Sequence, residues 1–502
     1  MSGGALARWL PGVGLALYLL GCLALWSGKA WKPEWDGAVY LETAQSLAAG
    51  EGYAYRGEPF FLRPPGLPWL LSFVVAPAGF DPARAGAVNG IVMLFAGLAA
   101  AAIFAAVRRG HGPWTSSAVA ALAASSPLFL QLFGWTLAEY PFAASAFAGI
   151  ALLEASFGAR GRTPRRVWIL AAAGGACLAA AILFRTVGVL LLPGVVLVAA
   201  WRGRGWGRLA GLLPVAIAGL LVVPWFLHAR AAAARAEVPV EQDLLLDYGT
   251  AMFHVDPGDP GSPRVDLAGW RGRIAANGSR LAADLTAGTV HLRAGGLAVQ
   301  IAVLALVLAG LVLAVRRRGP TLLEWLALAY TALLLTYFAY DPRLAMPLAP
   351  LVYLYLVTAA GELGAWLARR AGRPILRPAV GAAACAGLLA ASGASLAARP
   401  GEGTDLGASY RAMADWIRAE TPPGARILCN QAPILALLTD RPCYTYRFVR
   451  SADILAKYDI DYVLFDASPP PQLEPLVRAR RVRHWAIELG APGRATIVQV
   501  KR

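Results

Sequence analysis

Long apolar segments separated by short polar ones run through most of the chain. They lie at residues 9–27, 85–107, 114–133, 140–157, 167–184, 187–201, 209–227, 296–315, 321–340, 344–367 and 379–397. A helix of about 20 residues, rising about 1.5 Å per residue, crosses the bilayer core of about 30 Å. The pattern therefore predicts an all-α polytopic membrane protein with about 11 transmembrane helices. The first segment lacks a small-residue cleavage site, so we expect a retained helix and not a signal peptide.

One further apolar stretch, residues 67–80, is too short to span and contains Pro68 and Pro77. A stretch of about 14 residues with prolines is more typical of an interfacial or re-entrant segment. Whether it spans decides on which side every later loop lies, and the arginines favour one answer. Sixteen arginines and no acid lie in the alternate loops 108–113, 158–167, 202–208, 316–320 and 369–378, whereas the short opposite connections contain only Arg185 and Arg343. The positive-inside rule then predicts a cytoplasmic N-terminus and an external C-terminus.

This topology places three larger pieces outside the membrane. They are a first loop (residues 28–84), a middle loop (residues 228–295) and a C-terminal domain (residues 400–502), which follows the transmembrane domain of residues 1–399. The C-terminal domain alternates helix-like residues 410–420 and 452–458 with strand-like residues 426–429 and 462–466, which is typical of a small α/β domain. Asn277-Gly278-Ser279 in the middle loop is a formal glycosylation sequon, a pattern that is common by chance.

Composition agrees with this class and excludes others. The chain is 58% hydrophobic and 15% charged, which excludes a single water-soluble domain. The net charge of +16 comes mainly from arginines in short loops, so it fits membrane topology better than nucleic-acid binding. Five cysteines are too few for a disulfide framework. Cys429 and Cys443 are in polar context, where a disulfide or two free thiols are both compatible with the sequence.

Acids and bases from distant segments converge at the predicted outer face. Glu34, Asp36 and Arg63 lie in the first loop, Glu139 begins a span, Arg185 ends one, and Asp341 and Arg343 connect two others. Ionisable residues gathered at one membrane depth are typical of a functional site. Soluble-enzyme motifs such as a phosphate-binding loop, HExxH, paired CxxC or GxSxG do not occur in the sequence.

The first loop carries the most specific pattern. It combines Glu34-Trp35-Asp36, Tyr40, a helix-like segment to Gly50, Tyr53, and the run Phe60-Phe61-Leu62-Arg63-Pro64-Pro65-Gly66. In this the chain resembles the GT-C class of membrane glycosyltransferases, in the branch of the protein O-mannosyltransferases and the lipid A aminoarabinose transferase. Glu139 at the head of a span and Arg343 in the run Arg-Leu-Ala-Met-Pro-Leu-Ala-Pro match as well.

The resemblance implies transfer of a sugar from a polyprenyl-phosphate-sugar donor to a hydroxyl of a lipid, glycan or protein acceptor, at the outer face of a plasma (inner) membrane. Asp36 would then be the general base, with Glu139 as a second catalytic acid residue. Arg63, Arg185 and Arg343 would bind the donor phosphate, because guanidinium binds phosphate in bidentate fashion. Tyr40, Tyr53 and Asp341 are candidates for substrate binding. We expect no tightly bound cofactor or metal, and allow a weakly held divalent cation near Asp36 and Glu139.

Each of these residues also has a purely structural interpretation. Asp36 could be the N-cap of the helix that follows it, and Glu139 could favour the dipole at a helix start. Glu34 is expected to be solvated, Arg185 and Arg343 could extend to lipid headgroups, and the tyrosines could be interfacial aromatics.

Two other functions remain open. A lipid or sugar-lipid transporter would place ionisable groups at mid-membrane, whereas Glu154, Glu324 and Glu362 are expected toward the inner ends of spans. A non-enzymatic envelope assembly protein would tolerate replacement of Asp36.

Overall fold

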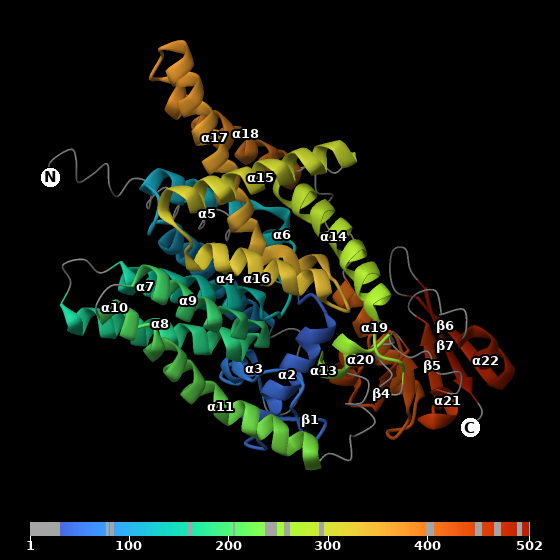
Figure 1. Ribbon diagram of the computed structural model, residues 1–502. Helices are drawn as coiled ribbons and strands as arrows, with labels where there is room; N and C mark the ends of the chain where they lie inside the picture. The colour runs from blue at the N-terminus through green and yellow to red at the C-terminus, as the bar shows by residue number, and fades with distance from the viewer. Residues whose placement is uncertain are drawn as a thin grey trace.

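The computed structural model describes residues 31–76, 80, 85–158, 163–203, 206–235, 248–255, 262–290, 296–397, 406–446, 454–465, 473–488 and 494–500. The predicted span at residues 9–27 lies outside the described residues, as does part of the middle loop. Figure 1 shows a helical body with the C-terminal sheet on one side of it and the α17–α18 hairpin extending at the other end.

The helical body is built from helices that overlap the predicted spans, except for a short one at residues 206–209, which lies mostly in a predicted loop. They are α4 (Ala85–Val107), α5 (Pro113–Ser125), α6 (Pro127–Leu130), α7 (Glu139–Phe157), α8 (Pro164–Phe184), η2 (Thr186–Leu190), α9 (Leu191–Arg202), α10 (Trp206–Leu209), α11 (Leu212–Arg235), α15 (Leu297–Arg318), α16 (Leu322–Thr336), η3 (Pro342–Leu348), α17 (Ala349–Ala371) and α18 (Leu376–Ala397). Each segment predicted from residue 85 onward is helical. The segment 114–133 is interrupted, because the chain turns at Ser126 before Pro127.

Seven of the described helices are long and apolar enough to cross a membrane. The helices at residues 186–202 and 322–336 are apolar but shorter, so the total of 11 spans and the orientation remain predictions. In the described residues of the predicted non-spanning stretch, 67–76 and 80, the one helix is α3 (Gly66–Leu71). A helix of six residues is about 9 Å long, far less than the bilayer core.

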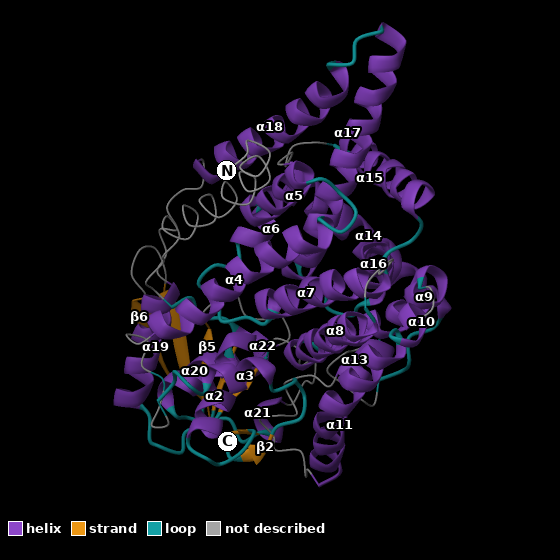
Figure 2. Ribbon diagram, turned by 90° about the vertical axis from the view of Figure 1, so that its left-hand side faces the viewer, coloured by secondary structure: helices purple, strands orange, loops and turns teal. Residues whose placement is uncertain are grey.

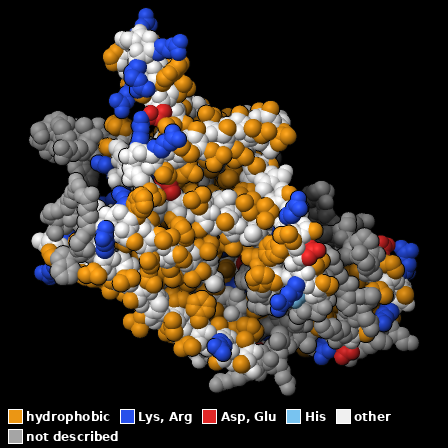
Figure 3. Space-filling view, viewed as in Figure 1, with side chains coloured by type: hydrophobic (Ala, Val, Ile, Leu, Met, Phe, Trp, Pro, Cys, Tyr) orange, Lys and Arg blue, Asp and Glu red, His pale blue; other side chains and the backbone are white. Residues whose placement is uncertain are grey.

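Burial within the body differs strongly from helix to helix. The apolar window of α7 is 83% buried, whereas those of α15 and α18 are 17% and 6% buried. Apolar side chains consequently cover much of the surface of the body, and arginines gather at the α17–α18 hairpin (Figure 3). Such a large apolar surface is stable against lipid and unfavourable in water. α7 is therefore central, and α15 and α18 are peripheral helices.

Small residues allow some helices to approach closely. A side chain at Gly310 of α15 would meet the Tyr355 carbonyl oxygen of α17 at 2.0 Å, and one at Gly175 of α8 would meet the Cα atom of Pro214 at 2.7 Å. Close backbone contact at small residues is a principal source of attraction between helices in a bilayer, where apolar side chains gain little by leaving lipid.

The first and middle loops contain ordered elements. The first loop forms α2 (Trp35–Ala48), a hairpin of β1 (Ala54–Tyr55) and β2 (Glu58–Pro59), and α3. The middle loop forms α13 (Tyr248–Phe253) and α14 (Leu267–Val290), and α14 packs along α16 and α17. Asn277 on α14 is buried, and its amide donates to the carbonyl groups of Leu334 and Tyr337. The sequon therefore does not present an accessible asparagine.

The C-terminal residues form the predicted α/β arrangement. Its elements are α19 (Leu406–Glu420), β3 (Ile427–Cys429), α20 (Ala432–Thr439), β4 (Cys443–Thr445), α21 (Ile454–Lys457), β5 (Tyr462–Phe465), α22 (Leu473–Arg480), β6 (Arg481–Glu488) and β7 (Arg494–Val500). The sheet order is β4-β3-β5-β7-β6, with β3, β4 and β5 parallel and the last two strands antiparallel. Cys429 and Cys443 are both buried, and in the β3–β4 register Cys429 lies opposite Thr445 and Cys443 opposite Ile427.

Helix α20 of this domain packs against α2 of the first loop. The two helices lie side by side in both Figure 1 and Figure 2. The C-terminal domain is thus in direct contact with the part of the chain that contains Asp36.

Candidate functional site

Six charged side chains meet where the first loop contacts the ends of the helical body. We call them the Asp36 cluster: Glu34, Asp36, Arg63, Glu139, Arg185 and Arg343. They come from α2, the turn before α3, the first residue of α7, the residue after α8, and η3. The predicted convergence of these distant segments is therefore present in the fold.

Asp36 lies between two guanidinium groups. Its Oδ1 atom is 2.7 Å from Nη2 and 3.0 Å from Nε of Arg63, and its Oδ2 atom is 2.6 Å from Nη2 of Arg343. The Asp36 side chain is 13% exposed. Burial acts to raise the pKa of Asp36, but the nearby guanidinium groups, first that of Arg63 and then that of Arg343, hold it well below its usual range.

Glu34, not Asp36, is the N-cap of α2. Glu34 has extended backbone angles, and its carboxylate accepts a hydrogen bond of 3.1 Å from the amide of Gly37. Its other oxygen, Oε1, is 3.0 Å from Nη1 of Arg343. The expectation that Glu34 is solvated is wrong, since its side chain is only 17% exposed. Burial raises the pKa of Glu34 to about 7, although the Arg343 guanidinium acts to lower it.

Glu139 and Arg185 form a second pair within the cluster. Glu139 is the first residue of α7 and accepts a hydrogen bond from Nη1 of Arg185, which follows the last residue of α8. An acid at a helix start and a base at a helix end also suit the two helix dipoles. Nε of Arg343 is 3.8 Å from Oε1 of Glu139 and links this pair to Asp36. Arg185 and Arg343 are thus paired with carboxylates inside the protein.

Two glycines let the segments of the cluster come together. A Cβ atom at Gly66 would lie 2.5 Å from the carbonyl oxygen of Leu183, near the end of α8, so only glycine fits after Pro64-Pro65. A Cβ atom at Gly37 would lie 3.0 Å from the carbonyl oxygen of Thr136. The turn that contains Arg63 and the start of α2 are therefore held against the helix ends that provide Arg185 and Glu139.

The three remaining predicted site residues surround the cluster. Tyr40 is buried on α2, one helical turn after Asp36. Tyr53 donates a hydrogen bond of 3.0 Å to the carbonyl of Arg63, and thus supports the turn before α3. Asp341 accepts from the amide of Arg343 at 3.0 Å and is 45% exposed. Their contact with a substrate remains a prediction.

Some buried polar atoms of the site have no hydrogen-bond partner among the described residues. They are Oγ1 of Thr136, Oε2 of Glu139 and Nε of Arg343. Buried polar atoms are normally satisfied, so an incomplete set marks a place for a polar ligand or water. The three arginines and three carboxylates balance in charge when all are ionised. A bound anion would therefore need a proton or a cation as compensation.

The described residues contain no group of three or more histidines, cysteines or acids arranged to hold a metal ion. The carboxylates of the cluster are bound to arginines. Any cation here would compete with guanidinium groups for Asp36 or Glu139.

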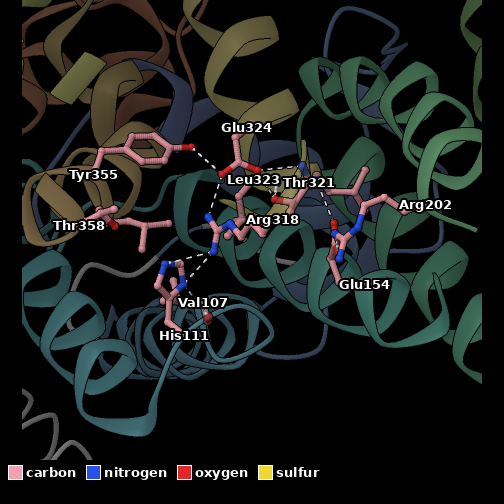
Figure 4. A network of polar contacts seen from close by, with 12 residues as sticks. Val107, His111, Glu154, Arg202, Arg318, Thr321, Leu323, Glu324, Tyr355 and Thr358 are labelled. Carbon is pink, nitrogen blue, oxygen red and sulfur yellow. Dashed lines mark hydrogen bonds and ion pairs between the residues drawn. The ribbon is translucent and has the colours of Figure 1, made fainter. Parts of the chain in front are cut away.

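A separate polar network lies among the arginine-rich loops. Arg318 pairs with Glu324 at 2.9 Å and places Nη1 3.0 Å from Nδ1 of His111, while Glu154 pairs with Arg202 (Figure 4). Glu324 also completes a capping box with Thr321. Burial and the Arg318 guanidinium lower the pKa of His111 to about 4, so the ring is neutral at pH 7.

Each acid of this network is satisfied by partners within the protein. Glu154 also accepts a hydrogen bond of 2.8 Å from the amide of Leu322, and Glu362 pairs with Arg317. Glu154, Glu324 and Glu362 each pair with an arginine of the arginine-rich loops, and that these are the inner ends of the spans stays a prediction. The network joins helices, and we assign it a structural role.

Sequence reasoning missed two features of the site. One is the pairing of Glu34 with Arg343. The spacing of Glu34 two residues before Asp36 could have indicated that both acids lie near the same arginine. The other is the hydrogen bond of 2.9 Å from Tyr340 to Asp284, which joins α14 to the turn before η3. Burial raises the pKa of Asp284. Nothing in the sequence pairs these two residues across the middle loop.

Comparison with solved structures identifies the fold. The archaeal oligosaccharyltransferase AglB from Archaeoglobus fulgidus, solved with an inhibitory peptide and a dolichol-phosphate, is 12% identical, with a TM-score of 0.61 over 91% of this chain and 69% of that chain. ArnT from Cupriavidus metallidurans bound to undecaprenyl phosphate is 14% identical, with a TM-score of 0.56 over 99% and 98% of the two chains. ArnT in the apo state is 15% identical, with a TM-score of 0.59 over 97% of this chain and 98% of that chain.

These matches show that the chain shares the fold of AglB and ArnT, which agrees at the level of fold with the predicted resemblance to GT-C glycosyltransferases. Neither a protein-family model nor a curated protein matches the chain.

Proposed function

We propose that this protein is a multi-pass membrane glycosyltransferase that transfers a sugar from a polyprenyl-phosphate-linked donor to an acceptor hydroxyl. The observation that carries the proposal is the position of Asp36 between Arg63 and Arg343. A proton acceptor and two phosphate-binding groups are then within one site. The fold adds support, since an ArnT of this fold was solved with undecaprenyl phosphate.

The proposed step is a displacement at the anomeric carbon. The acceptor oxygen forms a bond to that carbon, the bond from that carbon to the phosphate oxygen breaks, and the hydroxyl proton passes to Asp36. The phosphate changes from a singly charged diester to a monoester with more negative charge. Cations placed where this charge develops lower the barrier, which is the role we give to Arg63, Arg185 and Arg343.

Donor binding would also prepare the base. A carboxylate whose pKa is held far below 7 is a weak proton acceptor, because the best general base has a pKa near the working pH. A phosphate that takes over hydrogen bonds from Arg63 and Arg343 would release Asp36 and raise its pKa. Glu139 would keep Arg185 in place, and Glu34, with its pKa of about 7, is the alternative base.

The same proposal includes the location and the substrates. We place the site at the outer face of a plasma (inner) membrane, because the arginine-rich loops then lie in the cytoplasm. The acceptor is a lipid, a glycan or a protein, and a weakly held divalent cation near Asp36 and Glu139 would be one way to balance the charge of the phosphate. Tyr40, Tyr53 and Asp341 are proposed to contact the substrates.

The test is a transfer assay with purified protein in lipid nanodiscs. Undecaprenyl-phosphate sugars are supplied with extracted envelope glycans and lipids, and products are identified by mass spectrometry. Mass spectrometry of envelope lipids from a deletion strain would show which acceptor loses its sugar. Unchanged lipids and glycans, together with failure of the purified protein to bind undecaprenyl phosphate, would reject the transferase and favour an assembly role.

A further inference from the structure

The hairpin of the first loop turns at Arg56, which has an unusual backbone conformation. Arg56 and Gly57 connect β1 to β2, and their φ angles are 56° and 79°. A two-residue hairpin turn with positive φ at both positions favours Asn-Gly, because side chains larger than Asn rarely adopt this conformation. A residue held in a strained region usually has contacts that fix it there, and these are frequent at functional sites.

The Arg56 guanidinium provides such contacts. Its Nε atom is 3.0 Å from Oε1 of Glu42 on α2, and its Nη2 atom donates a hydrogen bond of 3.1 Å to the carbonyl of Arg441. Its Nη1 atom is 3.3 Å from Oδ1 of Asp440. The Arg56 side chain is 14% exposed. One side chain of the first loop thus touches both the helix that contains Asp36 and the loop between α20 and β4.

The three contacts differ in strength. The Asp440 side chain is 98% exposed, so solvent screens its attraction to Arg56 and that pair contributes little. Glu42 is 15% exposed, and the carbonyl of Arg441 accepts a charge-assisted hydrogen bond. Asp440, like Arg56, has positive φ, at 54°, where it ends α20. Two left-handed residues therefore meet at the junction between the first loop and the C-terminal domain.

The junction connects to both halves of the Asp36–Arg63 pair. On one side, α20 packs on α2, which contains Asp36. On the other, Tyr53 just before β1 accepts a backbone hydrogen bond of 2.9 Å from Phe60 and donates its hydroxyl to the carbonyl of Arg63. The orientation of the hairpin therefore affects where Asp36 and Arg63 stand relative to one another.

We propose that Arg56 is a positioning residue that fastens the C-terminal domain to the first loop, so that this domain forms part of the support of the Asp36 cluster. Its effect on turnover rests on the proposed function, whereas the docking contact does not.

The first experiment is hydrogen–deuterium exchange of the full-length protein in nanodiscs. Arg56→Asn removes the guanidinium and keeps a residue that tolerates positive φ, so the turn remains. We expect amide exchange in residues 35–48 and 432–445 to be on the order of tenfold faster than in the parent, because the junction opens more often. Arg478→Asn is the control, since Arg478 pairs with Glu474 at an exposed position of the same domain. It should leave both segments unchanged.

Glu42→Gln provides a second variant that leaves the turn untouched. It removes the charge that holds Nε of Arg56, and it should raise exchange in the same two segments. Unchanged exchange in both segments for Arg56→Asn and Glu42→Gln would overturn the docking role.

The second experiment measures transfer per folded molecule. Arg56→Asn should lower turnover about tenfold, because it disturbs the placement of Asp36. The pH dependence of turnover should stay that of the parent, because the ionisable groups of the site are unchanged. Arg478→Asn should match the parent. Faster exchange with parental turnover would overturn the positioning role. If the parent protein transfers no sugar but Arg56→Asn still exchanges faster, the proposed function is rejected and the docking contact is retained.

Discussion

The guanidinium of Arg343 donates a hydrogen bond of 2.6 Å to the carboxylate of Asp36, although 307 positions separate the two residues in the chain. Arg63, 27 positions from Asp36, occupies the other carboxylate oxygen. Asp36 therefore joins the first loop to the helical body at the site, together with Glu34, which also pairs with Arg343. A carboxylate in this position has both a charge that stabilises the arginines and an oxygen that a substrate proton could reach once they move.

Asp36→Asn separates these two roles. The amide has nearly the shape of the carboxylate, and the cap of α2 is retained because Glu34 provides it. Loss of proton acceptance should lower the rate of transfer about 10² to 10⁴-fold. Turnover is measured per folded molecule, because Arg63 and Arg343 lose their ion pair with Asp36 and the variant can be less stable than the parent. Asp415→Asn, which changes an exposed acid of the C-terminal domain, is the control. Parental turnover in Asp36→Asn would reject Asp36 as the base.

Arg63 is the residue to test for binding of the donor phosphate. Arg63→Lys keeps the charge and loses the bidentate geometry, so we expect a modest loss of affinity for undecaprenyl phosphate. Arg63→Ala should cost more, about 1.5 to 3 kcal/mol for a hydrogen bond to a charged group. Calorimetric titration in nanodiscs measures both, with Arg478→Ala as control. Parental affinity in Arg63→Ala, with a fall in acceptor binding, would transfer the phosphate role to Arg185 or Arg343.

Local sequence patterns predicted most of the fold. The apolar segments, the short stretch that forms α3 and the alternation in the C-terminal domain depend on the residue order within about 20 positions, which decides helix and strand periodicity. The convergence of Asp36, Glu139 and Arg343 was predictable because topology places the ends of alternate spans on one side.

Other features depend on contacts between distant segments, which no local pattern contains. The burial of Glu34 follows from its approach to Arg343, and the packing of Asn277 against the end of α16 follows from the path of the middle loop. The docking of α20 on α2 likewise depends on residues that are far apart in the chain. These contacts bury Glu34 and Asn277 and join the C-terminal domain to the first loop.

The raised pKa of Glu34 predicts a pH dependence near neutrality. The folded state holds a proton on Glu34 up to about pH 7, whereas the ordinary pKa is 4.5. Between these values the folded state binds more protons than the unfolded state, so the free energy of unfolding should fall as pH rises through this window. Glu34→Gln should remove this part of the dependence, which thermal unfolding at pH 5 to 8 measures.

The same titration should affect donor binding. Protonated Glu34 leaves Arg343 with one anionic partner fewer, so a sugar phosphodiester, which does not titrate in this range, should bind more tightly at pH 6 than at pH 8. We expect a difference of about tenfold, the equivalent of one pKa unit. Affinity that is independent of pH in the parent, or equally dependent in Glu34→Gln, would contradict this role of Glu34.

Topology can be tested at two exposed arginines. Arg478→Cys lies in the C-terminal domain, and Arg369→Cys lies at the α17–α18 hairpin. The positive-inside rule predicts that an impermeant maleimide labels position 478 in intact cells and position 369 only after permeabilisation. The parent protein controls for its own cysteines. The reverse labelling pattern would invert the arrangement and place the Asp36 cluster on the cytoplasmic side.

The Glu324 network should respond differently from the Asp36 cluster, because its acids have partners within the protein. Glu324→Ala removes a side chain that is 3% exposed and leaves Arg318 beside a neutral His111. Breaking a buried ion pair on one side costs about 3 to 5 kcal/mol, so the unfolding temperature should fall markedly. Turnover per folded molecule, and the affinity for undecaprenyl phosphate, should stay at the parental values. Arg317→Ala, which breaks the more exposed pair with Glu362, is the matched control and should cost under about 1 kcal/mol. A large loss of turnover in folded Glu324→Ala would mean that the network near the arginine-rich loops takes part in the reaction. The structural role assigned to this network would then be wrong.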